Sequence, residues 1–133
     1  FNESIGSIIS SSDEIIEVNT TLWEITNRIN TGKGPYNIDI SADGKFLVAT
    51  LKSDAKTLVW QLDKKNPSII SNNSTVSHGV VISPDSKYAF VTVEGVGGDP
   101  GLVDVIDLEK AKVVSSVNIG KQAGGIAFWK IEE

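Results

Sequence analysis

The chain has 133 residues, of which 40% are apolar and 22% charged, and its formal net charge is −5 at pH 7. This apolar content suffices for a folded core and excludes an intrinsically disordered chain. The acidic balance argues against nucleic-acid binding, and no apolar run approaches the ~20 residues that span a bilayer. Cysteine is absent, so the chain has neither disulfides nor thiolate chemistry.

The sequence begins at Phe1 and contains no methionine. Because translation starts at Met, we expect an upstream segment, either a signal peptide or further chain.

Short runs rich in β-branched and apolar residues, separated by turn signals, predict strands along the whole chain. No window shows a sustained helical period, so the fold class predicted is all-β. In chain order, the strands are expected at 4–10, 14–19, 23–30, 36–41, 46–51, 57–63, 68–71, 78–83, 88–94, 102–108, 112–118 and 124–130.

One stretch repeats. Residues 32–50 align with residues 74–92, with shared apolar positions and a shared Asp in the turn followed by Lys, and a third copy begins at Gly120. The equivalent positions Ile38, Val80 and Ile126 are 42 and 46 residues apart. Four strands within such a period are typical of one blade of a β-propeller.

The predicted architecture is therefore a series of β-propeller blades, each a four-stranded antiparallel sheet. The strands amount to about three blades in an incomplete ring, which we treat as a single propeller segment. Residues 1–31 would supply the last three strands of one blade, 32–73 and 74–119 two complete blades, and 120–133 the first strand of a further blade.

The motifs resemble the YVTN family of β-propeller repeats. They are Gly-Pro-Tyr-Asn-Ile at 34–38, Ser-Pro-Asp-Ser-Lys-Tyr-Ala-Phe-Val at 83–91, Val-Asp-Val-Ile-Asp-Leu at 103–108 and the C-terminal stretch 117–129. The resemblance implies a secreted, periplasmic or cell-surface protein and a ring of about seven blades. The rest of the ring would come from missing N-terminal blades, from another chain or from a second copy.

The position that varies within the repeat is where we expect function. It is occupied by Tyr36, then His78, then Gly124, at the entrance of each innermost strand, where side chains face the central channel. Loops on the same face add polar and charged side chains. The predicted ligand-binding residues are Tyr36, His78, Lys52, Glu94, Asp99 and Gln122.

No catalytic constellation is visible, since the chain lacks a G-x-S-x-G elbow and its one histidine, His78, has no evident nucleophile beside it. We predict no cofactor; His78 would ligate a metal only if other blades supplied further ligands. Carboxylates recur at repeat positions, as Asp39, Asp43, Asp85 and Asp107. Repetition at the blade period favours turn and strand-end hydrogen bonds over acid–base catalysis.

The leading functional hypothesis is a non-enzymatic binding or scaffolding module for a protein or small-molecule ligand of unknown identity. The alternative is the propeller part of an enzyme, since related propellers include lactonase-like hydrolases and periplasmic redox subunits with a metal or cofactor at the ring centre. We also expect the three tryptophans, Trp23, Trp60 and Trp129, to pack between blades.

Overall fold

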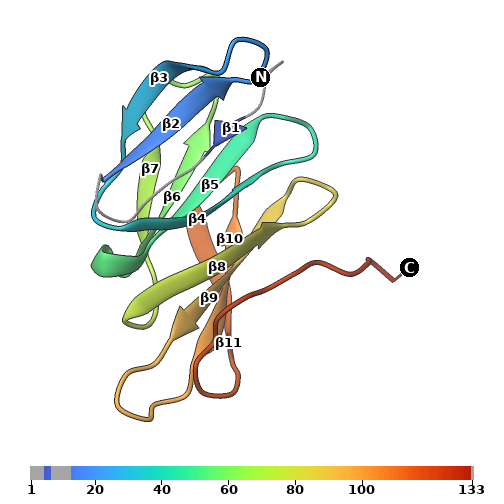
Figure 1. Cartoon of the computed structure of the whole chain (residues 1–133). Helices are drawn as coiled ribbons and strands as arrows, with labels where there is room; N and C mark the ends of the chain where they lie inside the picture. Colours follow the sequence, from blue (N-terminus) through green and yellow to red (C-terminus); the bar gives the residue numbers. More distant parts are fainter. Residues whose placement is uncertain (1–4, 7–12, 133) are drawn as a thin grey trace.

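The computed structural model describes residues 5–6 and 13–132. This part of the chain is all-β, with three antiparallel sheets whose strand orders are β1-β2-β3, β4-β5-β6-β7 and β8-β9-β10-β11. Figure 1 shows the sheets stacked in chain order. Among the described residues, no helix is long and apolar enough to cross a membrane. The elements are β1 (Ile5–Gly6), β2 (Glu14–Asn19), β3 (Glu24–Asn30), β4 (Pro35–Ile40), β5 (Phe46–Leu51), the 3-10 helix η1 (Lys52–Asp54), β6 (Lys56–Gln61), β7 (Ser68–Ser71), β8 (Val76–Ile82), β9 (Tyr88–Glu94), β10 (Leu102–Asp107) and β11 (Lys112–Asn118).

The predicted strands 14–19, 46–51, 68–71, 88–94 and 112–118 are confirmed with the same bounds. Most others are present with shifted ends. The strand expected at 4–10 is described only over Ile5–Gly6, and the rest of it lies outside the described residues.

The turns that join the first two strands of the second and third sheets are built alike. In the first, Ser41 Oγ donates to Asp43 Oδ1 at 2.7 Å and accepts the N–H of Phe46 at 2.9 Å. In the second, Ser83 Oγ donates to Asp85 Oδ1 at 2.6 Å in the same way. These contacts confirm that the repeated aspartates shape turns.

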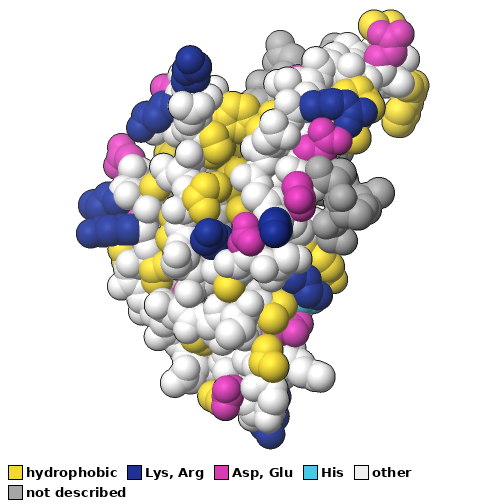
Figure 2. All heavy atoms as spheres, turned by 90° about the vertical axis from the view of Figure 1, so that its left-hand side faces the viewer, with side chains coloured by type: hydrophobic (Ala, Val, Ile, Leu, Met, Phe, Trp, Pro, Cys, Tyr) yellow, Lys and Arg dark blue, Asp and Glu magenta, His cyan; other side chains and the backbone are white. Residues whose placement is uncertain are grey.

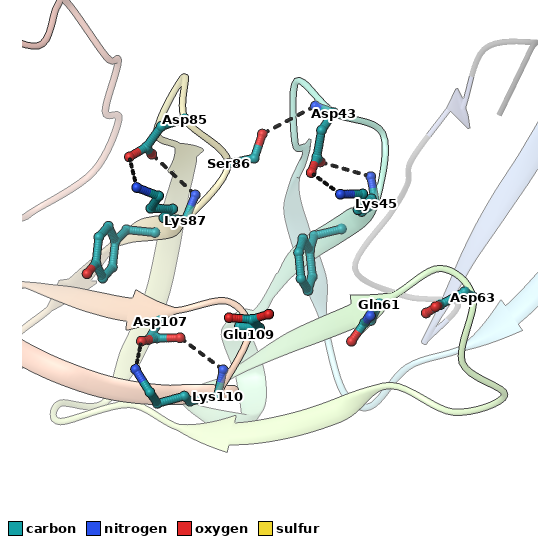
Figure 3. A pocket seen from close by; sticks show the side chains of 12 residues that line it. Asp43, Lys45, Gln61, Asp63, Asp85, Ser86, Lys87, Asp107, Glu109 and Lys110 are labelled. Atoms are coloured by element: carbon teal, nitrogen blue, oxygen red, sulfur yellow. Dashed lines mark hydrogen bonds and ion pairs between the residues drawn. The ribbon is translucent and has the colours of Figure 1, made fainter.

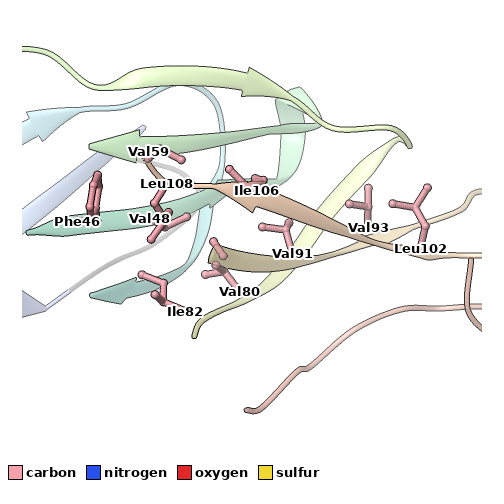
Figure 4. Packing of buried hydrophobic residues seen from close by; sticks show 11 residues of the cluster. Phe46, Val48, Val59, Val80, Ile82, Val91, Val93, Leu102, Ile106 and Leu108 are labelled. Atoms are coloured by element: carbon pink, nitrogen blue, oxygen red, sulfur yellow. The ribbon is translucent and has the colours of Figure 1, made fainter. Parts of the chain in front are cut away.

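The middle sheet is covered on both faces. All six residues of β5 are buried. Phe46 and Val48 belong to a cluster shared with the third sheet, whereas Leu47 and Leu51 pack with Ile15 of the first sheet. Successive strand residues point to opposite faces, so a strand between two sheets reads as a continuous apolar run. Figure 4 shows the cluster between the second and third sheets.

A buried carboxylate fastens the link between the second and third sheets. Asp104 on β10 is fully buried and accepts hydrogen bonds from Asn72 Nδ2 at 3.0 Å, from the backbone N–H of Asn73 at 3.0 Å and from Asn73 Nδ2 at 2.9 Å. The hydroxyl of Ser116 on β11 also donates to it. This network ties the connecting segment to the sheet that follows it.

The strand predicted at Gly124–Lys130 is wrong. Residues 119–132, which we name the C-terminal segment, form no strand although they follow the expected path beside the third sheet. Thr92 Oγ1 donates to the carbonyl of Gly124, and the rings of Phe90 and Phe128 are 6.0 Å apart. A strand requires a hydrogen-bonded neighbour. Among the described residues, the backbone-to-backbone bonds of this segment are confined to Ile119 and Gly120, which bond to Gly101, so residues 121–132 join no sheet.

The packing prediction for tryptophan holds for Trp60 alone. Trp60 packs against the core cluster around Leu47, and its indole N–H donates to the carbonyl of Lys64 at 2.9 Å. Trp23 and Trp129 are 79% and 88% exposed, so the prediction is wrong for them. Trp23 lies in the β2–β3 turn at a φ of 57°, and Trp129 lies in the unpaired C-terminal segment.

Figure 2 shows acidic, basic and apolar side chains interspersed over one face.

Candidate functional site

The innermost strands of the second and third sheets carry the same β-bulge. In β4 the bulge holds Tyr36, and the residue after it donates its backbone N–H to Thr50 Oγ1 at 3.0 Å. In β8 the bulge holds His78, and the residue after it donates to Thr92 Oγ1 at 2.8 Å. A bulge turns a side chain away from the regular pleat, and such irregularities are common beside binding sites.

Four predicted residues meet at these bulges and form what we name the mouth cluster: Tyr36, Lys52, His78 and Glu94. The rings of Tyr36 and His78 are 4.4 Å apart between centroids and tilted by 56°. Lys52 Nζ lies 4.4 Å from the centroid of the Tyr36 ring, within cation–π range. His78 Nε2 lies 3.4 Å from Glu94 Oε1. The residues come from β4, η1, β8 and β9, so the site depends on the stacking of two sheets.

The mouth cluster is partly open to solvent. Tyr36 is 46% exposed, whereas the side chains of His78 and Glu94 are 19% and 27% exposed. Such a surface offers an aromatic face, a cation and a carboxylate within one patch. This combination suits recognition of a ligand that has both apolar and polar groups.

The equivalence of Tyr36, His78 and Gly124 has a structural counterpart. Thr50 Oγ1 donates to the carbonyl of His78 at 2.7 Å, and Thr92 Oγ1 makes the corresponding bond to Gly124. A Cβ at Gly124 would lie 3.9 Å from His78 Cε1, so the glycine lies directly beside the imidazole. Because the third equivalent position is Gly124, no side chain from that position covers the His78 side of the mouth cluster.

Asp99 and Gln122 lie apart from this arrangement. Both residues are exposed, Asp99 in the loop after β9 and Gln122 in the C-terminal segment at a φ of 57°. Within the described part of the chain, no hydrogen bond or ion pair joins either side chain to the mouth cluster. Their predicted role in binding stays a prediction.

A cleft of about 600 Å³ opens at the opposite ends of β4 and β8, and we name it the turn-face cleft. Figure 3 shows that it lies between the β4–β5 and β8–β9 turns and the ends of β6 and β10. Its lining residues are Asp43, Lys45, Phe46, Gln61, Asp63, Asp85, Ser86, Lys87, Tyr88, Asp107, Glu109 and Lys110.

Sequence reasoning assigned the cleft's aspartates to turns and missed that these turns meet. The available signal was the Asp-x-Lys spacing in both repeats, at Asp43 and Lys45 and again at Asp85 and Lys87. A single bond links the two turns, from the N–H of Asp43 to Ser86 Oγ at 3.2 Å. That contact depends on sheet stacking, which the pattern of one turn does not reveal.

Three carboxyl groups of the cleft have a pKa below the ordinary value. For Asp43 and Asp85 the main cause of the lowered pKa is a hydrogen bond from the serine hydroxyl of the same turn, which stabilises the ionised form. For Asp107 the side chain of Lys110 has the largest effect on the pKa, and the same contact raises the pKa of Lys110. These carboxylates therefore stay ionised at neutral pH.

The described residues contain no group of three or more His, Asp or Glu side chains arranged to hold a metal ion. At the mouth, Glu94 is the one acidic side chain within ion-pair distance of His78 in that part of the chain. A metal on His78 would thus need ligands from outside these residues.

No family model and no curated protein matches the chain, so membership of the YVTN family stays a prediction. Solved structures do match. The chain aligns with hydrazine synthase of Kuenenia stuttgartiensis at a TM-score of 0.76 and 25% identity, over 84% of this chain and 32% of that one. It aligns with a functionally unknown protein from Desulfotomaculum acetoxidans DSM 771 at a TM-score of 0.75 and 21% identity, over 90% of this chain and 38% of that one.

These likenesses support a β-propeller-like fold. The chain spans about a third of the length of each protein, given coverages of 32% and 38%. They concern the fold, and fold does not determine function.

Proposed function

We propose that the chain is a non-enzymatic binding or scaffolding module whose ligand contacts the mouth cluster. The observation that carries this proposal is the convergence of Tyr36, Lys52, His78 and Glu94 from two sheets into one partly exposed patch. Aromatic side chains with a polar edge are favoured in binding surfaces because they bury much apolar area at low entropic cost.

The mouth cluster is preorganised for binding. The Tyr36 ring contacts both the cation of Lys52 and the imidazole of His78, and threonine hydroxyls accept the backbone N–H that follows each ring. A surface already ordered before association loses less conformational entropy when a ligand binds. The ligand class supported by this patch is a protein or small molecule that presents an aromatic or apolar group next to a polar one.

We further propose that the three sheets are about three blades' worth of an incomplete propeller, divided as the repeat predicts. Support comes from the first sheet, which has three strands among the described residues where the others have four, and from residues 121–132, which join no sheet. The remaining blades would come from N-terminal blades, another chain or a second copy. A monodisperse monomer of 14.2 kDa in light scattering after size exclusion would contradict assembly with a second copy.

The enzymatic alternative, a lactonase-like hydrolase or redox subunit, rests on resemblance and on the name of one structural neighbour, hydrazine synthase. Metal analysis of the intact protein, with the rest of the ring present, separates the two hypotheses. Stoichiometric metal that is lost in His78→Ala would favour the enzyme. The secreted, periplasmic or surface location likewise stays a prediction.

The binding proposal is tested by screening a library of small molecules and short peptides with ¹H–¹⁵N NMR on the isotope-labelled chain. We expect the amide shifts caused by hits to centre on Tyr36, Lys52, His78 and Glu94. A screen in which no hit moves these four amides would overturn the proposal. The turn-face cleft lies at the other ends of the strands, so the two sites are resolved in one spectrum.

A further inference from the structure

The turn-face cleft has the size and the walls of a ligand site. Its volume of about 600 Å³ falls within the range of natural small-molecule pockets, roughly 300–1,000 Å³. It lies between two sheets that share a hydrophobic core, so its lining depends on the packing of both sheets. Its residues play no part in the mouth cluster.

The charges around the cleft are unequal. Each of the three lysines is matched by an aspartate of its own turn, with Nζ–Oδ2 distances of 3.4 Å for Lys45, 3.7 Å for Lys87 and 2.6 Å for Lys110. The other two carboxylates, Asp63 and Glu109, have no cation within ion-pair distance among residues 13–132. Figure 3 shows Glu109 between the Asp107–Lys110 pair and Gln61.

This imbalance leaves two uncompensated negative charges in a concave site. A cleft lined by one excess sign focuses the field and raises the local concentration of ions of opposite sign. Metal ions are not the favoured occupants, because the described side chains around the cleft do not form a group that could hold one. The favoured ligand is an organic cation, because hydrogen bonds to separate carboxylates are enough to bind it and no set of three or four converging ligands is needed.

The aromatic wall favours a cation on an aliphatic stem. Phe46 and Tyr88 begin β5 and β9 at equivalent positions, and both rings line the cleft. Tyr88 is 38% exposed and offers ring surface to a ligand, whereas Phe46 is 7% exposed. An alkyl stem gains apolar contact with such rings while its charged end reaches the carboxylates.

We propose that the turn-face cleft binds an organic cation, a primary ammonium or guanidinium group on an aliphatic stem, through Glu109 and Asp63 against the Tyr88 ring. The site is separate from the mouth cluster and adds a second binding function to the one proposed above. The cation can belong to a free diamine or to a lysine or arginine side chain of a partner, and the two sources share this chemistry.

Isothermal titration calorimetry on the whole chain at low ionic strength tests the proposal. The probes are 1,5-diaminopentane and arginine amide for the free cation, a tripeptide of arginine and lysine for the side chain, and glutarate as a dianion of the same carbon length. We expect the cations to bind and glutarate not to bind, with affinity falling as salt is added. Tighter binding of the tripeptide would identify a partner's side chain as the source, and tighter binding of the diamine would identify a free ligand.

The variant Asp63→Asn/Glu109→Gln removes the two uncompensated charges from exposed positions and preserves side-chain size. We expect it to weaken cation binding by about tenfold. The matched control Glu24→Gln/Glu132→Gln removes two exposed carboxylates outside the cleft and should change the affinity by less than about twofold. Absence of cation binding, equal binding of glutarate, or equal losses in variant and control would each overturn the proposal.

Discussion

Replacing the buried carboxylate of Asp104 by an amide should destabilise the fold through one network. Asp104→Asn keeps the shape of the side chain but converts one acceptor oxygen into a donor. Asp104 accepts from Asn72, from both nitrogens of Asn73 and from the hydroxyl of Ser116. Because a hydroxyl can turn and accept instead, the least costly placement of the new amide faces Ser116 and Asn73 Nδ2.

In that placement Asn73 Nδ2 loses the oxygen of residue 104 as its acceptor. The remaining hydrogen bonds are made to a neutral amide instead of a carboxylate. A hydrogen bond to a charged group contributes about 1.5–3 kcal/mol, and an unsatisfied buried donor costs about 1–3 kcal/mol. Asn73 is exposed and recovers part of this loss from water. We therefore expect the free energy of unfolding to fall by about 2 kcal/mol.

Urea unfolding followed by circular dichroism measures this change. With a slope of about 2 kcal/mol/M, the midpoint should fall by about 1 M while the slope stays the same. The control Glu24→Gln alters an exposed carboxylate on β3 and should change the unfolding free energy by less than about 0.5 kcal/mol. A loss in Asp104→Asn as small as that of the control would refute the reasoning.

Three further perturbations probe the core, the turns and the C-terminal segment. Leu47→Ala should lower the unfolding free energy by about 3 kcal/mol because Leu47 is fully buried, whereas Leu22→Ala, at a 64% exposed position, should change it little. The turn carboxyls have a lowered pKa in the fold, so their stabilisation is present above the ordinary pKa of 3.8 and is lost as pH falls through the lowered pKa. We therefore replace the three carboxyls by amides, at Asp43, Asp85 and Asp107, and measure the unfolding free energy as the pH is lowered. The variant should lose less stability in acid than the wild type, and an equal loss would contradict the reasoning. Gly79→Ala would place a Cβ 2.8 Å from the Gly124 carbonyl oxygen and should speed hydrogen exchange in the C-terminal segment, whereas Gly125→Ala meets nothing within 4 Å and should not. Equal exchange in both glycine variants would contradict the packing described.

Local chemistry makes much of the fold predictable from the sequence. The Asp43-Gly44 turn and the β-branched runs on either side of it specify a hairpin without information from distant residues. The repeat supplies the register, because aligning its copies is enough to make Tyr36 and His78 equivalent. Their placement in matching bulges confirms that equivalence.

What the sequence did not reveal depends on contacts between distant segments. The run from Gly124 to Lys130 has strand-like composition, yet a strand exists only where a neighbour pairs with it. The turn-face cleft arises where turns of two sheets meet, and its charge balance depends on Asp63 and Glu109. Asp63 recurs as Asp107 at the blade period, but the repeat does not show that the two carboxylates line one cleft. The approach of Lys52 to the Tyr36 ring likewise follows from the 3-10 helix after β5.

The central claim is that the mouth cluster is the binding surface of this module. Its most direct test is the affinity of the best NMR hit for the wild-type chain and for Tyr36→Ala/His78→Ala, with Tyr88→Ala as the control at the other ends of the strands. We predict a loss of about tenfold, 1.4 kcal/mol, in the double variant and no change in the control, with amide spectra that keep the native dispersion. Equal affinity for the wild type and the double variant would contradict the claim.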